Sequence, residues 1–204
     1  IVTSDKCYLN REDHHHYDET DPLGGRDPYS ASKACAEIVT ASFRDSYCSP
    51  SGPHSNIHIA TARAGNVIGG GDFAVDRLIP DSIRARISNK TIEVRNPHSV
   101  RPWQHVLEPL SGYLLLAEQM NNSRDYCESW NFGPSKDEVI SVEGLLQLAI
   151  QQCPEIKFSI TTNPGPHEAG LLLLNADAAD ERLHWKPKWP IEEAVKQTYA
   201  WYNA

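Results

Sequence analysis

The segment from Asp27 to Lys33 reads Asp-Pro-Tyr-Ser-Ala-Ser-Lys and carries a phenol and an ammonium four residues apart. We expect it to open an alanine-rich helix, because Asp27 can cap the first turn and Pro28 suits the first helical position. Residues four apart share one face of a helix, so Tyr29 and Lys33 would be neighbours. A nearby positive charge stabilises a phenolate. The pair therefore predicts a proton-transfer site with Tyr29 as the base.

A second group of polar residues precedes this segment. Ser4, Asp5 and Lys6 follow an apolar start over residues 1–3 that is typical of the end of a buried strand, and Asp5 lies 24 residues before Tyr29 (29 − 5 = 24). In isolation, the aspartate would be a turn cap and the lysine a solvated charge. Their position relative to Tyr29 favours a functional role instead.

Further segments occur in the order in which one enzyme family carries them. They are residues 21–25 (Asp-Pro-Leu-Gly-Gly), 63–72 (Arg-Ala-Gly-Asn-Val-Ile-Gly-Gly-Gly-Asp), 101–106 (Arg-Pro-Trp-Gln-His-Val), 130–135 (Trp-Asn-Phe-Gly-Pro-Ser) and 166–169 (Pro-His-Glu-Ala). With the Tyr29/Lys33 pair, they resemble the extended short-chain dehydrogenase/reductase family and, within it, the nucleotide-sugar 4,6-dehydratases. Most of these enzymes have Thr-Asp-Glu where this chain has Ser4 to Lys6, and the lysine resembles the branch that acts on CDP-glucose. The resemblance covers nearly the whole chain.

The resemblance implies NAD as cofactor, CDP-glucose or a related nucleotide sugar as substrate, and a lyase of deoxysugar biosynthesis such as that of lipopolysaccharide O-antigen. In such an enzyme NAD takes hydride from sugar C4, water leaves across C5 and C6, and the hydride returns to C6. The resemblance assigns the 4-hydroxyl proton to Tyr29, the nicotinamide ribose to Lys33 and a hydrogen bond to the 4-oxygen to Ser4. Asp5 would protonate the departing 6-hydroxyl, which requires a pKa raised by burial. Lys6 stands where relatives carry the glutamate that removes the C5 proton, so it would have to act in its neutral form.

The resemblance also predicts a substrate-binding set around the nucleotide diphosphate, for which arginine is the preferred planar clamp. These residues are Asn66, Arg77, Leu78, Arg95, Arg101, His167 and Glu168. For Arg63 and Arg95 the choice between a solvated strand end and a ligand contact stays open. Trp103 and Trp130 are expected in the core or the site wall. Asn175, where the family has aspartate, departs from the pattern.

No Gly-x-x-Gly-x-x-Gly motif occurs in the chain, and the glycines at 69–71 lack a following Lys-Ser/Thr, which favours a flexible turn over a phosphate cradle. We therefore expect the C-terminal part of a longer enzyme that lacks about 130 residues with the dinucleotide-binding turn. Alone it should be inactive. The family forms homo-oligomers, dimers or dimers of dimers, through the helix that carries Tyr29. Its outer face near Ile38, Val39, Ser42 and Phe43 should be exposed, so that the isolated chain associates irregularly.

The composition predicts a cytoplasmic protein. A net charge of −8 (19 − 27) disfavours nucleic acid and anionic membranes as partners. The longest apolar runs fall far short of the about 20 residues that span a bilayer, and the start does not resemble a signal peptide. Five cysteines without Cys-x-x-Cys spacing disfavour a disulfide scaffold or a zinc site. The histidines at 14–16 favour a solvated loop over a metal cluster, so no metal is expected.

Helical and strand periodicities alternate along the chain. Helices are predicted over residues 28–46, 76–88, 109–120, 142–152, 177–183 and 190–202, and strands over 56–62, 91–94, 129–132 and 157–162. Pro80 should lie in the first turn of its helix or kink it. The alternation predicts an α/β fold with a parallel sheet. With the resemblance, it implies the latter part of a Rossmann-type doubly wound sheet plus a small C-terminal lobe.

The expected domains divide near Asn66. Residues 1–66 would form the latter part of the NAD-binding domain, and residues 67–204 mainly a sugar-nucleotide-binding lobe, with about 97–135 returning to the first domain. The active site would lie between them. Two alternatives stay open. One is a sugar-nucleotide epimerase or reductase, which needs no acid and base at Asp5 and Lys6, and the other is a non-catalytic interaction or regulatory fragment.

Overall fold

The computed structural model describes residues 1–161 and 169–204. Its helices are η1 (Asp5–Cys7), α1 (Pro28–Ser46), α2 (Leu78–Ile87), α3 (Leu107–Asn122), η2 (Arg124–Tyr126), α4 (Val142–Gln152), α5 (Asp177–Leu183) and α6 (Ile191–Tyr202). Its strands are β1 (His16–Tyr17), β2 (Thr61–Ala64), β3 (Val67–Ile68), β4 (Thr91–Val94), β5 (Val100–Arg101), β6 (Gln104–His105), β7 (Ser129–Phe132), β8 (Ile140–Ser141), β9 (Lys157–Ile160) and β10 (Leu173–Leu174).

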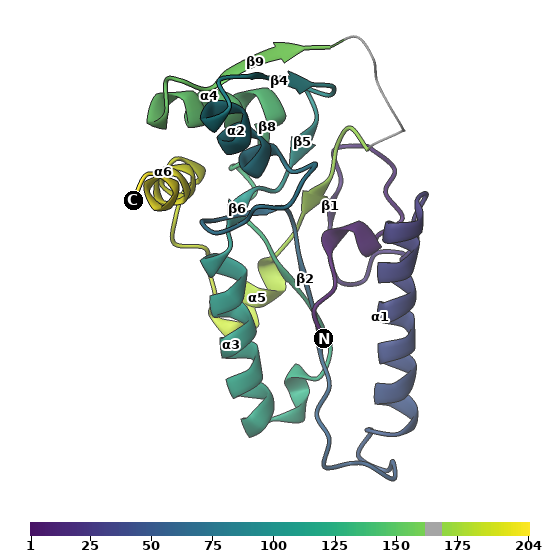
Figure 1. Ribbon diagram of the computed structural model, residues 1–204. Helices are drawn as coiled ribbons and strands as arrows, with labels where there is room; N and C mark the ends of the chain where they lie inside the picture. Colours follow the sequence, from purple (N-terminus) through teal and green to yellow (C-terminus); the bar gives the residue numbers. More distant parts are fainter. Residues whose placement is uncertain (162–168) are drawn as a thin grey trace.

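A parallel strand pair, β2 with β7, forms the centre of one half of the molecule. Residues 1–3 extend it at the other edge of β2 in the same direction, since Val2 pairs with Ala62. The long helices α1 and α3 run alongside on either side (Figure 1). The first residues therefore end a strand, as predicted. Ile1 and Val2 are nevertheless exposed rather than buried, because they lie at the open edge of this pair.

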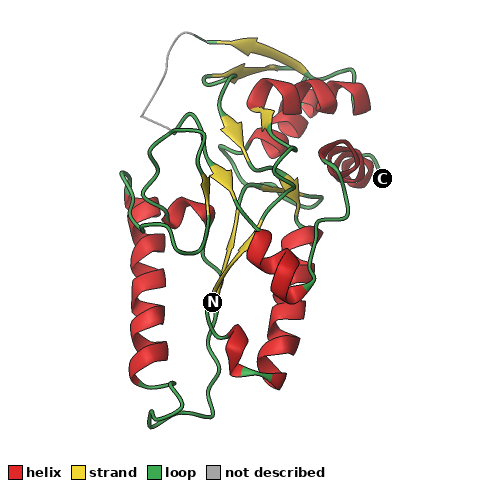
Figure 2. Cartoon of the chain, turned by 180° about the vertical axis from the view of Figure 1, so that it is seen from behind, coloured by secondary structure: helices red, strands yellow, loops and turns green. Residues whose placement is uncertain are grey.

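The other half contains the parallel pair β4 and β9 with helices α2, α4 and α6 (Figure 2). Its core includes Ile83 of α2, Leu145 of α4 and Val195 of α6, all buried. Short pairs lie between the halves: β3 with β6 and β1 with β10 are parallel, and β5 with β8 is antiparallel. Residues of β3, β5 and the first turn of α1 line a common cavity.

Local sequence explains where the main helices begin. Asp27 caps α1 by accepting a hydrogen bond from the backbone N of Ser30 at 3.0 Å, and Pro28 is the first helical residue. Pro80 falls in the first turn of α2, where its missing N–H costs nothing. Ser141 caps α4 through the backbone N of Gly144 at 3.1 Å. The places of Asp27, Pro28 and Pro80 agree with the sequence predictions.

The predicted elements mostly match the observed ones. Helices over 28–46, 142–152 and 177–183 and strands over 91–94 and 129–132 are confirmed to the residue. The strand predicted over 56–62 overlaps β2 only at Thr61 and Ala62, because the chain turns at His54–Ile57 and the pairing with β7 begins at Thr61. The strand predicted over 157–162 ends at Ile160 within the described residues. Strands of two residues, such as β3 and β5, are too short to show a period.

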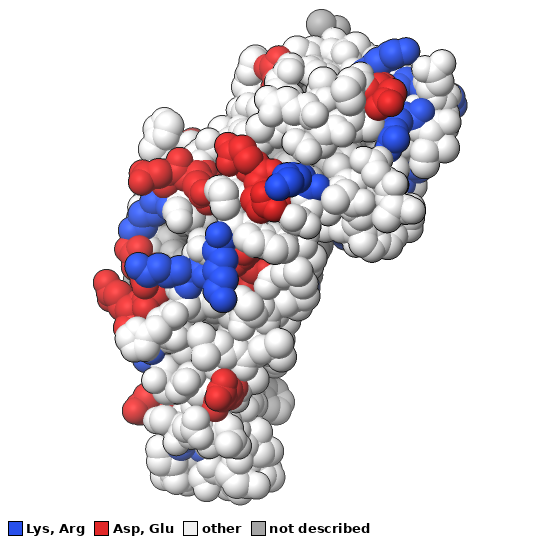
Figure 3. Space-filling model, turned by 90° about the vertical axis from the view of Figure 1, so that its left-hand side faces the viewer, with Lys and Arg blue, Asp and Glu red and all other residues white. Residues whose placement is uncertain are grey.

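The surface of the described residues carries both signs of charge. Acidic and basic side chains lie side by side on the face in Figure 3. The outer face of α1 is exposed as predicted: Ile38, Val39 and Phe43 are each more than half accessible, and Ser42 is also exposed. Among all the residues that the structure describes, no helix is long and apolar enough to cross a membrane. The five cysteines are all free thiols.

Candidate active site

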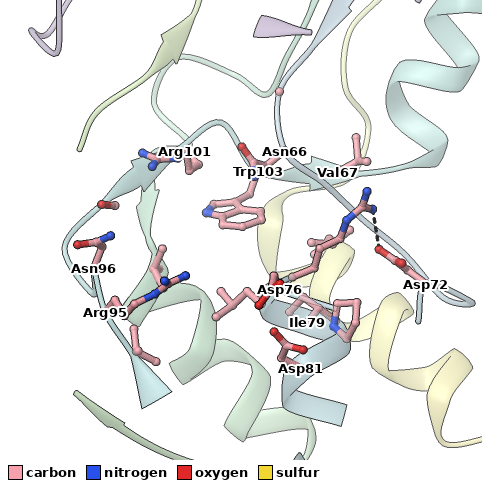
Figure 4. Close-up of a pocket in the computed structure, with 18 of the residues that line it drawn as sticks. Asn66, Val67, Asp72, Asp76, Ile79, Asp81, Arg95, Asn96, Arg101 and Trp103 are labelled. Atoms are coloured by element: carbon pink, nitrogen blue, oxygen red, sulfur yellow. Dashed lines mark hydrogen bonds and ion pairs between the residues drawn. The ribbon is translucent and has the colours of Figure 1, made fainter. Parts of the chain in front are cut away.

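A cavity of about 740 Å³ lies where the two halves of the molecule meet. Figure 4 shows residues that line it. The predicted site residues on its wall are Ser4, Asp5, Lys6, Tyr29, Asn66, Arg77, Leu78, Arg95 and Arg101. Lys33 lies behind this wall, next to Tyr29, whereas His167 and Glu168 lie outside the described residues. The structure thus brings together residues that are almost a hundred positions apart in the chain.

The turn η1 presents a serine and an aspartate to the cavity. The hydroxyl of Ser4 accepts a hydrogen bond from the backbone N of Lys6 at 3.2 Å and donates one to Asp5 Oδ1 at 3.0 Å. Asp5 is buried, and its Oδ2 has no hydrogen-bond partner among the described residues. Burial raises the pKa of Asp5 to about 6, although the Ser4 hydrogen bond and the charges of Lys6 and Arg101 oppose the shift. Asp5 can therefore carry a proton near neutral pH.

The first turn of α1 presents the predicted base. Tyr29 is half exposed at the cavity. The Nζ of Lys33 lies 5.6 Å from the centre of the Tyr29 ring, and the Nζ of Lys6 lies 5.9 Å from it. Both ammonium groups are thus within cation–π range of one ring. The Tyr29 ring lines the cavity beside two cationic side chains.

Three arginines also line the cavity. Arg77, immediately before α2, is exposed and forms an ion pair of 2.9 Å with Asp72 (Figure 4). Arg95 is exposed at the end of β4. Arg101 in β5 is buried, and its guanidinium donates to the backbone oxygens of Val100, at 2.8 Å, and Ala169. Guanidinium groups spread over one wall suit an extended anion such as a diphosphate.

A close backbone crossing places Asn66 beside this wall. A Cβ on Gly65 would lie 2.4 Å from Cγ of Pro102 and 2.7 Å from its carbonyl oxygen, so only glycine permits the contact. Trp103 follows directly, is buried, and faces the cavity, as expected of a wall residue (Figure 4). Trp130 is wholly buried in the core, which confirms the other half of that expectation.

Neither interpretation offered for Arg63 is correct. Its side chain is buried in β2 rather than solvated, and it pairs with Glu37 at 2.8 Å instead of lining the cavity. Burial alone would raise the pKa of Glu37, but the hydrogen bonds and charge of Arg63 outweigh it and lower that pKa. The sequence holds a signal for this pairing. Arg63 lies among the small and apolar residues of β2, and a buried arginine needs a carboxylate partner.

Acidic residues of the cavity were also missed. Asp72, Asp76, Asp81 and Glu93 line it together with the arginines. Asp76 has a positive φ of 60°, a conformation that aspartate tolerates better than most residues. No spacing in the sequence marks these carboxylates.

The glycines at 69–71 form a turn in which Gly70 lies so close to Trp201 that a Cβ would come within 2.1 Å of the indole.

Known proteins match the chain along nearly all of its length. A family model described as GDP-mannose 4,6 dehydratase matches residues 1–198. The CDP-glucose 4,6-dehydratase of Salmonella typhimurium (strain LT2) is 43% identical over an alignment of 206 positions, which covers 100% of this chain and 57% of that enzyme. The chain thus spans little more than half the length of this curated relative.

Solved structures share the fold. A dTDP-glucose 4,6-dehydratase from Bacillus anthracis in complex with NAD superposes with a TM-score of 0.79 at 20% identity, over 99% of this chain and 60% of that one. A UDP-glucose 4-epimerase from Stenotrophomonas maltophila, with bound NAD and formylated UDP-arabinopyranose, gives 0.83 at 20% identity, over 99% and 62%. These likenesses confirm the predicted α/β, Rossmann-type fold class.

Proposed function

Because the chain belongs to the GDP-mannose 4,6 dehydratase family, we propose that it provides the reacting residues and the sugar-nucleotide pocket of an NAD-dependent CDP-glucose 4,6-dehydratase. The identity to the Salmonella enzyme supports this assignment along the whole chain. The observation that carries it is the buried, protonatable Asp5 in the same cavity as Tyr29. A lyase needs such an acid to expel the 6-hydroxyl, whereas an epimerase or reductase does not. Asp5 therefore favours dehydration over the alternatives.

The residues around the cavity fit this reaction. Bound NAD would supply the hydride acceptor for C4 and the donor for C6, and the cationic setting of Tyr29 and Lys33 suits its ribose. Tyr29 takes the 4-hydroxyl proton while Ser4 orients the 4-oxygen. Lys6 takes the C5 proton while Asp5 gives its proton to the departing 6-hydroxyl, and Lys6 returns a proton to C5 when C6 receives hydride. The sugar leaves as a 4-keto-6-deoxy product with no net change of oxidation state.

The remaining residues hold the nucleotide diphosphate in this proposal. Arg77, Arg95 and Arg101 clamp its phosphates. Asn66, just before β3, and Leu78, the first residue of α2, contact it, which their shared cavity supports. His167 and Glu168 complete the set on the family motif alone. The sheet around β2 and β7 would belong to the NAD-binding domain, which the pairing of residues 129–132 with residues 61–64 supports. The remainder, except about 97–135, would form the sugar-nucleotide lobe.

We further propose that the protein acts in the cytoplasm, in deoxysugar biosynthesis such as that of O-antigen, as a dimer or a dimer of dimers. The exposed apolar residues Ile38, Val39 and Phe43 on α1 support a contact between copies there. Burying them would recover a hydrophobic contribution of about 25 cal/mol per Å².

The experiment that tests the function uses the protein that carries these 204 residues, with NAD and CDP-glucose in D₂O. We expect a 4-keto-6-deoxy product with deuterium at C5, and at least about tenfold lower kcat/KM with dTDP-glucose. In Lys6→Ala, oxidation at C4 should persist while C5 exchange with solvent stops. Absence of the keto product from the wild-type protein contradicts the function, and unchanged C5 exchange in Lys6→Ala contradicts only the role of the lysine.

A further inference from the structure

The reacting residues lie on two separate elements, so their separation has to be fixed by something else. Ser4, Asp5 and Lys6 belong to the turn at η1, whereas Tyr29 and Lys33 belong to α1. The Nζ of Lys6 lies 5.9 Å from the centre of the Tyr29 ring. Proton transfer depends on this separation, because a misplacement of about 1 Å can cost about 100-fold in rate.

Glu37 ties α1 to the strand that leads into the turn. It follows Tyr29 by eight residues and Lys33 by four (37 − 29 = 8; 37 − 33 = 4), so the three share one helix face. Its carboxylate is buried, with 1% of the side chain exposed. One oxygen accepts a hydrogen bond from the hydroxyl of Thr3, which directly precedes Ser4. The other accepts from the hydroxyl of Thr61 in β2 at 2.7 Å.

Arg63 extends this tie to the other end of the turn. Its Nη2 donates to Glu37 Oε2 at 2.8 Å, and its Nη1 donates to the hydroxyl oxygen of Tyr8 at 2.8 Å. Tyr8 directly follows η1, and its own hydroxyl donates to Asn131 Oδ1 in β7 at 2.7 Å. One buried ion pair therefore holds both Thr3 and Tyr8, the residues that flank Ser4 to Cys7.

We propose that the Glu37–Arg63 ion pair is a positioning unit, which sets the place of Ser4, Asp5 and Lys6 relative to the tyrosine and lysine of α1 without touching the substrate. A buried ion pair with both partners hydrogen-bonded has essentially one geometry, because a shift of the helix would leave a charge unpaired away from water. The buried ion pair thus fixes the position of the helix relative to the turn, about two helical turns from Tyr29, whose ring lines the cavity. The kinetic part of this inference rests on the proposed function.

Glu37→Gln tests the proposal, since it keeps the shape of the side chain and removes the charge. With NAD and CDP-glucose, kcat should fall about ten- to a hundredfold, while KM for the nucleotide sugar changes less than about twofold, because the arginines of the cavity lie on other elements. Thr3→Val removes one hydrogen bond and leaves the ion pair, so kcat should fall by about three- to tenfold. If Glu37→Gln does not fold, the kcat of Thr3→Val tests the proposal, and an unchanged kcat in this variant contradicts it.

Glu108→Gln is the matched control. Glu108 is likewise a buried glutamate of a long helix, and its carboxylate accepts hydrogen bonds from the backbone N of Lys188 and of Trp189, both at 3.0 Å, outside the cavity. This variant should lose stability as Glu37→Gln does and keep kcat within about twofold. Equal losses of kcat in the two variants would show that only general destabilisation is at work, and the positioning role would be rejected.

Amide hydrogen exchange separates this proposal from the proposed function. Residues 3–8 should exchange faster in Glu37→Gln than in the wild type and Glu108→Gln, whether or not CDP-glucose is the substrate. If the wild-type protein does not turn over CDP-glucose, the proposed function fails and the exchange experiment alone decides the structural tie. Unchanged exchange over residues 3–8, or an unchanged kcat in an active enzyme, overturns the inference.

Discussion

Two ion pairs of almost equal length serve the two sides of this site differently. Glu37 and Arg63 are joined at 2.8 Å with side chains 1% and 3% exposed, behind the reacting residues. Asp72 and Arg77 are joined at 2.9 Å with side chains 33% and 63% exposed, on the cavity wall. The two distances do not distinguish these pairs. Their exposure to water does, because water screens the charges of Asp72 and Arg77 and competes for their hydrogen bonds.

The difference separates a fixed region from an adaptable one. Breaking the buried pair would leave a charge without solvation, at a typical cost of about 3–5 kcal/mol. Opening the exposed pair costs about 0–1 kcal/mol, so a phosphate can displace Asp72 from Arg77. Substitutions near η1 and α1 should therefore change turnover, and substitutions among the exposed arginines should change binding.

Among the substitutions that test this division, Tyr29→Phe should have the largest effect, on the rate of the first hydride transfer. Without the phenol, the 4-hydroxyl proton has no acceptor, so the first hydride transfer should slow by about 10²- to 10⁴-fold. The affinity for CDP-glucose should stay within about twofold, because the arginine wall is untouched. Stopped-flow absorbance of NADH measures the first step, and calorimetry measures the affinity. Near-normal NADH formation would remove Tyr29 from its role.

Tyr47→Phe is the control for this substitution. Tyr47 lies just after α1, is as exposed as Tyr29, and does not line the cavity. Its replacement should leave both hydride transfer and affinity unchanged. A loss of turnover in Tyr47→Phe would mean that replacing a tyrosine on or next to α1 lowers activity by destabilising the fold, and the result for Tyr29→Phe would not show a role in proton transfer.

Asp5→Asn tests the fixed region through the pH dependence of the free energy of unfolding. The pKa of Asp5 rises from 3.8 to about 6 in the folded protein, so folding favours its protonated form. The resulting stability is fully present below pH 3.8 and is lost as the pH rises through about 6. At pH 7.5 the buried charge thus costs (6 − 3.8) × 1.36, or about 3 kcal/mol.

Asparagine at position 5 removes that cost. The free energy of unfolding should increase by about 1–3 kcal/mol at pH 7.5 and change little at pH 4, while dehydration is lost. Urea unfolding at the two pH values measures it. Asp45→Asn, at an exposed position, should change stability by less than about 0.5 kcal/mol at either pH. A gain for Asp5→Asn that is equal at both pH values would mean that the carboxyl is not protonated in the fold.

Much of the fold was accessible from the sequence because its helices have local signals. Asp27 and Pro28 fix the start of α1, and periodicity fixes α4. The strand predicted over 56–62 begins too early, because β-branched residues such as Ile57 and Ile59 also occur in unpaired backbone, and only pairing with β7 decides where β2 begins.

The candidate site was accessible for a different reason. The proposed reacting residues have types and spacings that the proposed chemistry requires, and Asp5 and Tyr29, which this pattern predicts, do line one cavity. Arg63 was misinterpreted because its partner Glu37 is 26 residues away, and their contact depends on how α1 packs on β2. Carboxylates such as Asp72 gave no sequence signal, since their place in the cavity follows from loop geometry.

Arg77→Ala gives the smallest expected effect and tests the adaptable region. A charge-assisted hydrogen bond to phosphate is lost, but Asp72 already competes for Arg77 and water screens it, so affinity for CDP-glucose should fall only about tenfold. The rate of hydride transfer at saturation should not change, and unfolding free energy should stay within about 0.5 kcal/mol. Calorimetry and stopped-flow absorbance measure these quantities.

Salt provides the second half of this test, because only a screened contact responds to it strongly. Raising the salt from about 0.05 to about 0.5 M should weaken CDP-glucose binding more in the wild type than in Arg77→Ala, since the variant has lost a contact that screening weakens. Lys186→Ala is the control: Lys186 is as exposed as Arg77 and has one carboxylate partner, Asp180, also at 2.9 Å, but it lies outside the cavity. It should keep both the affinity and the salt response of the wild type. If Arg77→Ala instead lowered the rate at saturation with affinity intact, the exposed wall would be part of the reacting geometry, and the division between a fixed and an adaptable region would be wrong.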